Sequence, residues 1–406
     1  MKEKLKSTLS RVYFQVLSKA LSIGFTAPFE QIDKIWFSHL IEENITPSAI
    51  REDKEKLIVK IRDSQHLHTE PKYLKLNKTS LNSKTKLRIA ILINAKENHL
   101  LVDVFNDLMA SANAVGHICE IFTSSHEQLN DKSVGRENLL LEQFKPDLVI
   151  AEAHNDPTKF HASKNLNLLN LKTKLGFKIF LISIDLWRDF DFKFIQSWRT
   201  LYDALIHLDI QSVEEFKIEK DFWWPYFSHP TMKKDENVAR NRVLFSGNLR
   251  FPERRSWLYQ SSKLAKQMNV KFKVEALNYT SAIWKSRNEY LRELNNVTAC
   301  LNFSWKKSNF TLITFRTLDV ISAGSALLQQ EDPESMPLRD FLVPYLHYIP
   351  FFSKLELSAI FLLMKENPDL IEKIARTGSD FYKNRYSKTY LWSILENRFK
   401  FEAAYE

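Results

Sequence analysis

Apolar runs and helical patterns alternate along the first half of this 406-residue chain. Residues 87–94 are apolar almost without interruption, which is typical of a strand buried on both faces of a parallel sheet. Further strands are predicted at 117–123, 146–152, 177–184 and 204–208, with helices at 100–114 and 137–144. This alternation predicts a doubly wound parallel sheet.

The pattern pauses over residues 222–241 and then begins a second series. Strands are predicted at 242–247, 270–276, 297–303 and 325–330, and helices at 253–268, 285–294 and 313–323. The length of the chain also suits two cores, so we expect two Rossmann-like α/β domains that face each other across a cleft. A last helix at 388–401 is expected to cross back over the first domain.

A helical extension precedes the two domains. Apolar positions recur every three or four residues from Leu5 to Leu21, which predicts an amphipathic helix over residues 2–25. Its apolar face either docks on the protein's own surface or lies on a membrane, and nearby basic residues keep the second alternative open. These basic residues are Lys2, Lys4, Lys6, Arg11 and Lys19.

The domain boundaries follow from these patterns. We expect a helical extension and linker at 1–85, a first Rossmann-like domain at 86–235, a second at 236–387 and a crossover helix at 388–406. The linker is assigned because residues 63–86 are rich in lysine, serine and asparagine.

Composition and charge narrow the choice of partner. The formal charge of +9 favours an anionic partner, but there is no zinc-finger spacing and no RNA-binding aromatic signature, so no nucleic acid is expected. The two cysteines, Cys119 and Cys300, lie in apolar runs and suit a reducing cytosol. No apolar run is long enough to span a bilayer. The expected location is cytoplasmic, with peripheral contact with an anionic membrane face as a further expectation.

The loop after strand 242–247 is the first candidate site. Gly247 lets backbone approach a phosphate, the following helix offers its positive N-terminus, and the cluster of Arg250, Arg254 and Arg255 offers forked donors. The alternative is a tight turn with arginines that face solvent.

A second candidate is the pair Arg316 and Asp319. These residues are three apart on a predicted helix and therefore share a face. The carboxylate is suited to sugar or ribose hydroxyls, and the guanidinium is suited to phosphate. From spacing alone, a simple surface ion pair is the stronger alternative.

The surroundings of this pair resemble a known family. The segment Arg316-x-x-Asp319-x-x-x-x-Gly324, followed by an apolar strand and Glu331-Asp332, resembles the donor-site segment of GT-B glycosyltransferases. The resemblance is greatest to the spore-maturation-protein-like relatives of glycosyl transferase group 1. Residues 343–350 are also similar to lipopolysaccharide and protein O-glucosyltransferases. The likeness covers about residues 240–395, and Asp319 stands where most relatives have glutamate.

The resemblance implies a GT-B fold and a metal-independent glycosyltransferase of the hexosyltransferase type. It implies an acceptor domain at 86–235 and a nucleotide-sugar donor domain at 236–387. Arg316 and Asp319 would act in catalysis. For His347, donor binding and a packing role in the core are equally open. The donor-binding residues implied are Gly247, Asn248, Arg250, Arg254, Ser304, Thr314, Arg316, Asp319, Gly324 and His347.

The partners implied are a nucleotide-diphosphate sugar and a glycan, lipid-linked or protein acceptor, as in surface glycan, lipopolysaccharide or glycoconjugate synthesis. No cofactor and no metal are expected, since arginines and helix N-termini can neutralise a leaving diphosphate. His154 and Asp185 each follow a predicted strand of the first domain and are candidate bases toward an acceptor hydroxyl. Helix capping is the alternative for both residues.

Two other functions remain open from the sequence. The aspartate at position 319 and the scarcity of glycine would also suit a catalytically inactive GT-B-like module that binds a partner or membrane through its basic N-terminal helix. A sugar-nucleotide epimerase of similar two-domain build is a third possibility.

Overall fold

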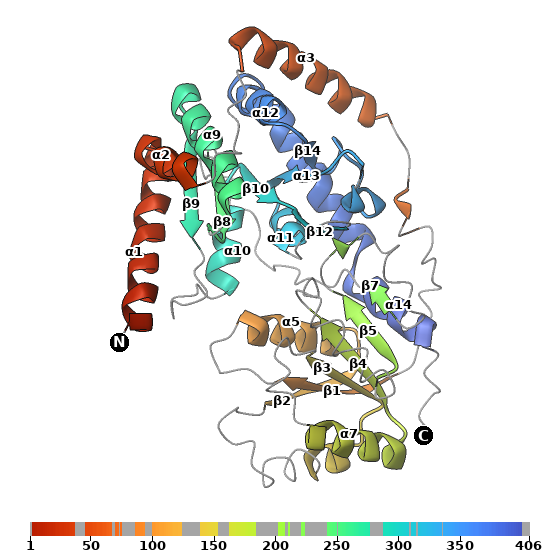
Figure 1. Ribbon diagram of the computed structural model, residues 1–406. Coiled ribbons are helices and arrows are strands. Elements are labelled where there is room, and N and C mark those ends of the chain that lie inside the picture. Colours follow the sequence, from red (N-terminus) through yellow and green to blue (C-terminus); the bar gives the residue numbers. More distant parts are fainter. Residues whose placement is uncertain are drawn as a thin grey trace. The chain divides into compact units, whose positions relative to one another are not determined.

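The computed structural model divides into two compact units (Figure 1). Unit 1 comprises residues 1–73, 229–305 and 316–383, and unit 2 comprises 74–228, 306–315 and 384–406. The structure describes residues 2–36, 45–66, 70–72, 74, 86–93, 100–123, 139–152, 162–183, 202–207, 210–211, 221–223, 242–249, 251–276, 287–307, 310–313, 316–334 and 336–399.

Unit 2 is built on a parallel sheet with the strand order β2-β1-β3-β4-β5-β7. Its strands are β1 (Arg88–Ile93), β2 (Ile118–Thr123), β3 (Leu148–Glu152), β4 (Lys178–Ser183), β5 (Ala204–His207) and β7 (Asp221–Trp223). Helices α5 (Leu100–Ala114) and α7 (Ala162–Leu175) and a helical stretch at 139–144 connect them. Because β1 is buried along nearly its whole length, it is the strand that an uninterrupted apolar run predicts.

Unit 1 is built on a second parallel sheet with the order β14-β13-β10-β8-β9. Its strands are β8 (Arg242–Gly247), β9 (Lys271–Ala276), β10 (Ala299–Phe303), β13 (Ala326–Gln330) and β14 (Ile349–Phe351). Its other helices are α9 (Pro252–Met268), α10 (Arg287–Asn295), α11 (Arg316–Ser322), η3 (Pro337–Asp340), α12 (Lys354–Glu366) and α13 (Pro368–Arg385), whose last residues pass into unit 2. Two parallel-sheet α/β domains confirm the predicted fold class.

The N-terminal helices are part of unit 1: α1 (Lys2–Ile23), α2 (Ala27–Trp36) and α3 (Pro47–Ser64). Helix α1 lies along β9, the last strand of the sheet (Figure 1). The Ser18 hydroxyl donates to the Val274 carbonyl, and the Val274 N–H donates to the Ser22 hydroxyl at 3.0 Å. These bonds satisfy backbone groups that an edge strand would otherwise expose.

A buried ion pair holds α2 against α9. The guanidinium of Arg255 makes two bonds of 2.7 Å to the carboxylate of Asp33, and the Tyr259 hydroxyl donates to the same carboxylate at 2.7 Å. Both charged side chains are almost fully buried. This geometry meets the requirement that a buried charge be paired and hydrogen-bonded.

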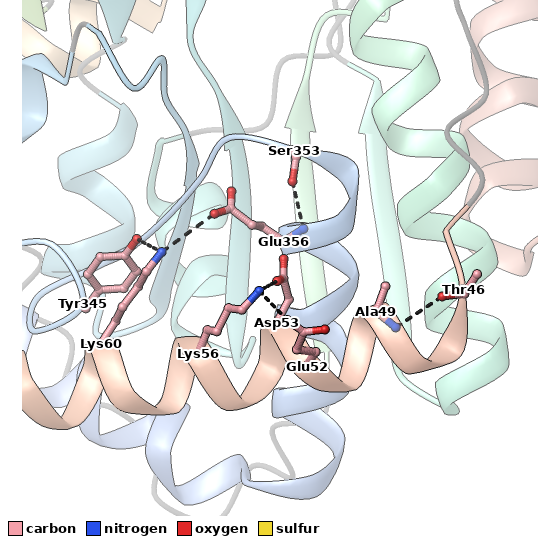
Figure 2. A network of polar contacts seen from close by, with 9 residues as sticks. All are labelled: Thr46, Ala49, Glu52, Asp53, Lys56, Lys60, Tyr345, Ser353 and Glu356. Carbon is pink, nitrogen blue, oxygen red and sulfur yellow. Dashed lines mark hydrogen bonds and ion pairs between the residues drawn. The ribbon is translucent and has the colours of Figure 1, made fainter.

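Helix α3 packs against α12 through apolar and polar contacts. The amine of Lys60 donates to the Tyr345 hydroxyl at 3.4 Å and lies 3.9 Å from a Glu356 oxygen. Both contacts are drawn as dashed lines in Figure 2. The backbone N–H of Glu356 donates to the hydroxyl of Ser353, which caps α12, as Thr46 caps α3. The cap of each helix is therefore encoded in its own sequence.

One predicted helix begins later than expected. Residues 310–313 form β12 (Phe310–Ile313), so α11 begins at Arg316 rather than at 313. Strand β12 runs antiparallel to β6 (Ile210–Gln211) in a small sheet that also contains β11 (Trp305–Lys307). Ile313, the first residue of the predicted helix, therefore belongs to a strand that is defined by pairing with a segment about a hundred positions away.

The last helix, α14 (Lys388–Phe399), belongs to unit 2. The indole N–H of its buried residue Trp392 donates to the Ser111 hydroxyl on α5 at 3.1 Å. The C-terminal helix is therefore packed on the unit whose sheet is formed by earlier parts of the chain.

Candidate functional site

The sheet of unit 1 has a topological switch point between β8 and β10. These strands are neighbours, but β8 leads to β9 on one side and β10 leads to β13 on the other. Ligands of open parallel sheets bind beyond the carboxyl ends of the strands at such a point, because the two connections leave in opposite directions. The residues that follow β8 and β10 are therefore the candidates for a binding site.

Three polar residues follow neighbouring strands at this edge. Strand β8 is followed by Asn248, β10 by Ser304 and β13 by Glu331. Phe303 pairs with Gln330 in register, and the pairing of Val243 with Ala299, continued along the strands, brings Asn248 level with Ser304. We call Asn248, Ser304 and Glu331 the carboxyl-edge row.

The loop after β8 is fixed by the helix that follows it. Arg254 donates from its guanidinium to the Asn248 carbonyl at 3.0 Å, and its guanidinium carbon lies 5.3 Å from the centre of the Phe251 ring. A Cβ atom added to Gly247 would lie 2.8 Å from the Phe245 ring, so glycine suits the close packing here. Helix α9 begins at Pro252, and the side chain of its N-cap residue Phe251 makes no capping bond. The N-terminus of a long helix therefore follows the switch point directly.

The predicted arginine cluster divides into residues with different roles. Arg255 is buried against Asp33 and also donates to the Leu249 carbonyl at 2.8 Å, so it stabilises the fold and is not available to a phosphate. Arg254 is half-buried and remains beside the loop. Sequence alone does not distinguish these adjacent residues, because Asp33 lies 222 positions away.

A buried polar network joins α11 to the sheet. The Asn302 amide nitrogen donates to the Thr317 hydroxyl at 2.6 Å and to the Gln329 amide oxygen at 2.9 Å. Gln329 in turn donates to the Gln330 carbonyl. Because every bond of the network is buried or half-buried, it holds the first turn of α11 at a defined place over β10 and β13.

Asp319, one half-turn beyond Thr317, is 0% exposed. Its carboxylate is covered by protein, so this structure does not present it to a ligand hydroxyl. Arg316 opens the helix, but its side chain lies outside the described residues. Gly324 has φ +76° and ends α11, where the Ser325 N–H donates to the Val320 carbonyl. These contacts give Gly324 a role in helix termination.

Glu331 belongs to the acidic pair that follows the apolar strand of the donor-site segment, and it was not among the predicted site residues. It is buried, and the Tyr348 hydroxyl donates to its carboxylate at 3.0 Å. Burial raises the pKa of Glu331 to about 8, and this effect outweighs the lowering contributions of Tyr348, the Leu338 backbone and Arg339. The acidic pair after the apolar strand was the signal that could have identified it.

His347 makes packing contacts. Its Nδ1 accepts a bond of 3.1 Å from the Val343 N–H, and its ring stacks on Phe381 with a centroid distance of 4.0 Å. Burial lowers the pKa of His347 to about 4, so the ring is neutral at physiological pH. A Cβ on Gly378 would lie 2.3 Å from the His347 carbonyl oxygen. The packing alternative accounts for all these contacts.

Four other predicted site residues, His154, Asp185, Arg250 and Thr314, lie outside the described residues. Within the described ranges, no cluster of histidine, cysteine, aspartate or glutamate side chains is suited to a metal ion. None of the described helices combines the length and apolarity needed to cross a bilayer.

A pocket of about 90 Å³ lies between α3 and α12, lined in part by Lys56, Lys60 and Tyr345. Its charged groups already have partners: Lys56 pairs with Glu52 and Asp53, and Lys60 lies beside Glu356 (Figure 2). Because these charges compensate each other, the two lysines of this pocket offer no unpaired positive charge to a diphosphate.

Comparison with known proteins supplies structural likeness alone. No protein-family model and no curated protein matches the chain. A glycosyltransferase from Rickettsia africae is 9% identical, with 78% of this chain and 98% of that chain covered and a TM-score of 0.46. TarM is 11% identical, with a TM-score of 0.45; the match covers 66% of this chain and spans 58% of TarM.

A third solved structure belongs to another class of enzyme. A protein of Listeria monocytogenes that is provisionally described as a UDP-N-acetylglucosamine 2-epimerase is 11% identical, with a TM-score of 0.41. The match covers 79% of this chain and 99% of that chain. At these scores the likenesses carry no argument about substrate or reaction. The two parallel-sheet α/β domains are established by the chain's own strand order.

Proposed function

We propose that this protein is a GT-B glycosyltransferase that binds a nucleotide-diphosphate sugar at the carboxyl edge of the unit 1 sheet. The observation that carries the proposal is the switch point between β8 and β10, where the carboxyl-edge row lies beside the loop that leads into α9. A helix N-terminus suits the negative charge of a diphosphate. The donor-site segment that begins at Arg316 follows in the same unit.

In the proposed reaction, the bond between the sugar's anomeric carbon and the diphosphate breaks, and a bond to the acceptor oxygen forms. The acceptor proton passes to a base, for which His154 and Asp185 are the candidates. Arg250, Arg254 and Arg316 would stabilise the charge on the leaving diphosphate, without a metal ion. Asp319 would bind donor hydroxyls after a movement of the residues that bury its carboxylate.

We further propose that the donor is a nucleotide-diphosphate hexose. The acceptor is a hydroxyl group of a glycan, of a lipid-linked molecule or of a protein, and the product is a cell-surface glycan or glycoconjugate. The resemblance of segment 316–324 to the donor site of GT-B enzymes supports the nucleotide-sugar donor in this proposal. The proposed location is the cytoplasm.

The experiment measures sugar transfer by the full chain and by Arg316→Ala. Turnover should fall by about a hundredfold or more in the variant while its circular dichroism is unchanged. Product formed without any acceptor would instead indicate an epimerase. If no sugar nucleotide is bound or consumed, the inactive-module alternative takes the place of the enzyme.

A further inference from the structure

Helix α1 carries apolar side chains on two faces. Leu17, Ala20 and Leu21 are buried against unit 1, as the amphipathic pattern predicts. Val12 and Val16 are each 51% exposed and Ile23 is 69% exposed. Residues 12, 16 and 23 are spaced by four and seven and therefore form one stripe, which points away from the buried one at about 100° per residue.

Phe25 lies two residues after the last residue of the helix and is 59% exposed. Its position is fixed, because the Phe25 N–H donates to the Ala20 carbonyl at 2.9 Å across the turn at Gly24. We use the term outer apolar face for the helical stripe of Val12, Val16 and Ile23 together with the exposed Phe25 beyond the helix end. Among the described residues, five of the eight exposed large apolar side chains lie between positions 12 and 32. Scattered apolar residues are ordinary on a protein surface, but this concentration is not.

The outer apolar face is presented on a rigid support. Helix α1 is tied to β9 through Ser18 and Ser22, and the Ser262 hydroxyl on α9 donates to the Leu21 carbonyl. The face therefore needs no conformational change to meet a partner. The loss of conformational entropy that weakens binding by flexible segments is therefore small here.

Charge decides which partner suits the face. The sequence of α1 contains five basic residues and one acidic residue, and the whole chain carries +9. Lys19 is exposed and, at about 100° per residue, borders the stripe formed by Val12, Val16 and Ile23. A second copy would bring two such positive helices together across a symmetric contact, which like-charge repulsion opposes. An anionic lipid surface attracts them.

We infer that α1 attaches this protein to an anionic phospholipid membrane, with the outer apolar face entering the interfacial region. An apolar stripe with lysine beside it, held parallel to a surface, is the arrangement that interfacial helices use. The inference does not depend on the proposed sugar transfer. Because α1 belongs to unit 1, the inference implies that unit 1 and its carboxyl-edge row are held at a lipid surface.

Vesicle flotation of the full chain tests the inference. The protein should float with vesicles of phosphatidylcholine and phosphatidylglycerol, and much less with phosphatidylcholine alone, at low salt. A variant with Val12, Val16, Ile23 and Phe25 all changed to serine should partition about tenfold or more weakly. Because these side chains are exposed, the variant should keep the circular dichroism of the parent.

Val59 on α3 provides a matched control, since it is 53% exposed and lies outside the outer apolar face. Val59→Ser should float like the parent. A second readout uses Val16→Cys and Val59→Cys labelled with an environment-sensitive dye, because both native cysteines are buried. Emission should shift to shorter wavelength on anionic vesicles for the Val16 site alone.

Three results would overturn the inference. The first is a parent protein that does not float with the anionic vesicles. The second is a serine variant that floats as well as the parent. The third is a concentration-dependent dimer in sedimentation that the serine substitutions abolish, since this would identify the face as a contact between copies.

Discussion

Asn302 on β10 donates from its side-chain amide to the hydroxyl of Thr317 on α11 at 2.6 Å. The same amide reaches Gln329 on β13, so one side chain connects two strands and the helix that carries Asp319. The placement of the candidate donor helix thus depends on a buried polar contact. If one partner of such a contact is removed, the other polar group stays buried without a hydrogen bond, and the folded state loses stability.

We predict that Asn302→Ala lowers the free energy of unfolding by about 1–3 kcal/mol, because the Thr317 hydroxyl and the Gln329 amide lose a buried partner. Urea unfolding measures this change. In a double-mutant cycle with Thr317→Ala, the two losses should be non-additive by about 1 kcal/mol. Simple additivity would contradict a direct coupling between these residues.

The ion pair between Arg255 and Asp33 gives a second prediction. Arg255→Ala should cost about 3–5 kcal/mol, because it leaves the Asp33 carboxylate buried without its charge partner. The control is Lys263→Ala on the same helix. Lys263 pairs with Glu30 at 2.7 Å but is 44% exposed, so its loss should cost less than about 1 kcal/mol. Equal effects of the two substitutions in thermal unfolding would argue against the role assigned to burial.

Glu331 predicts a pH dependence of stability. Its pKa of about 8 in the folded protein lies above the ordinary value of 4.5, so the folded state retains a proton that the unfolded state has released. The stabilising contribution is therefore complete below about pH 4.5 and is lost as the pH rises toward 8. In urea unfolding, Glu331→Gln should reduce the fall in stability between pH 5 and pH 8, by on the order of 3 kcal/mol. An unchanged slope would show that Glu331 titrates normally.

Covering the edge of β9 is a further testable role of α1. Replacing Ser18 and Ser22 together by alanine removes the side-chain partners of the Val274 N–H and carbonyl. The double variant should lose about 1–3 kcal/mol of stability, and amide hydrogen exchange at Val274 should become faster. Unchanged protection at Val274 would mean that the helix shields the strand by packing alone.

The sheet strands of both units could be predicted where apolar residues follow one another, as at residues 89–93 of β1 and 243–245 of β8. Strand β7 could not, because Asp221-Phe-Trp223 is too short to show a pattern. Strand β12 was not predicted, because its four residues are too few to show a pattern, and it is defined by pairing with β6, a contact between distant residues. Local sequence patterns do not predict pairings between distant segments.

The same limit applies to the candidate site. The glycine turn and the segment from Arg316 to Gly324 were visible as motifs, but the separation of Arg255 from Arg254 depended on Asp33 from the N-terminal extension. The burial of Glu331 depended on Tyr348 and its surroundings, which lie on another segment. Neither relationship is expressed in residue spacing.

Calorimetric titration of sugar nucleotides against two matched variants tests the central claim most directly. Ser304→Trp places a large side chain at the carboxyl end of β10, and Asn296→Trp places the same side chain just before its amino end. We predict saturable heat with at least one donor for the parent and for Asn296→Trp, and none for Ser304→Trp. Binding that survives in Ser304→Trp, or is absent from the parent with every donor, would contradict the account.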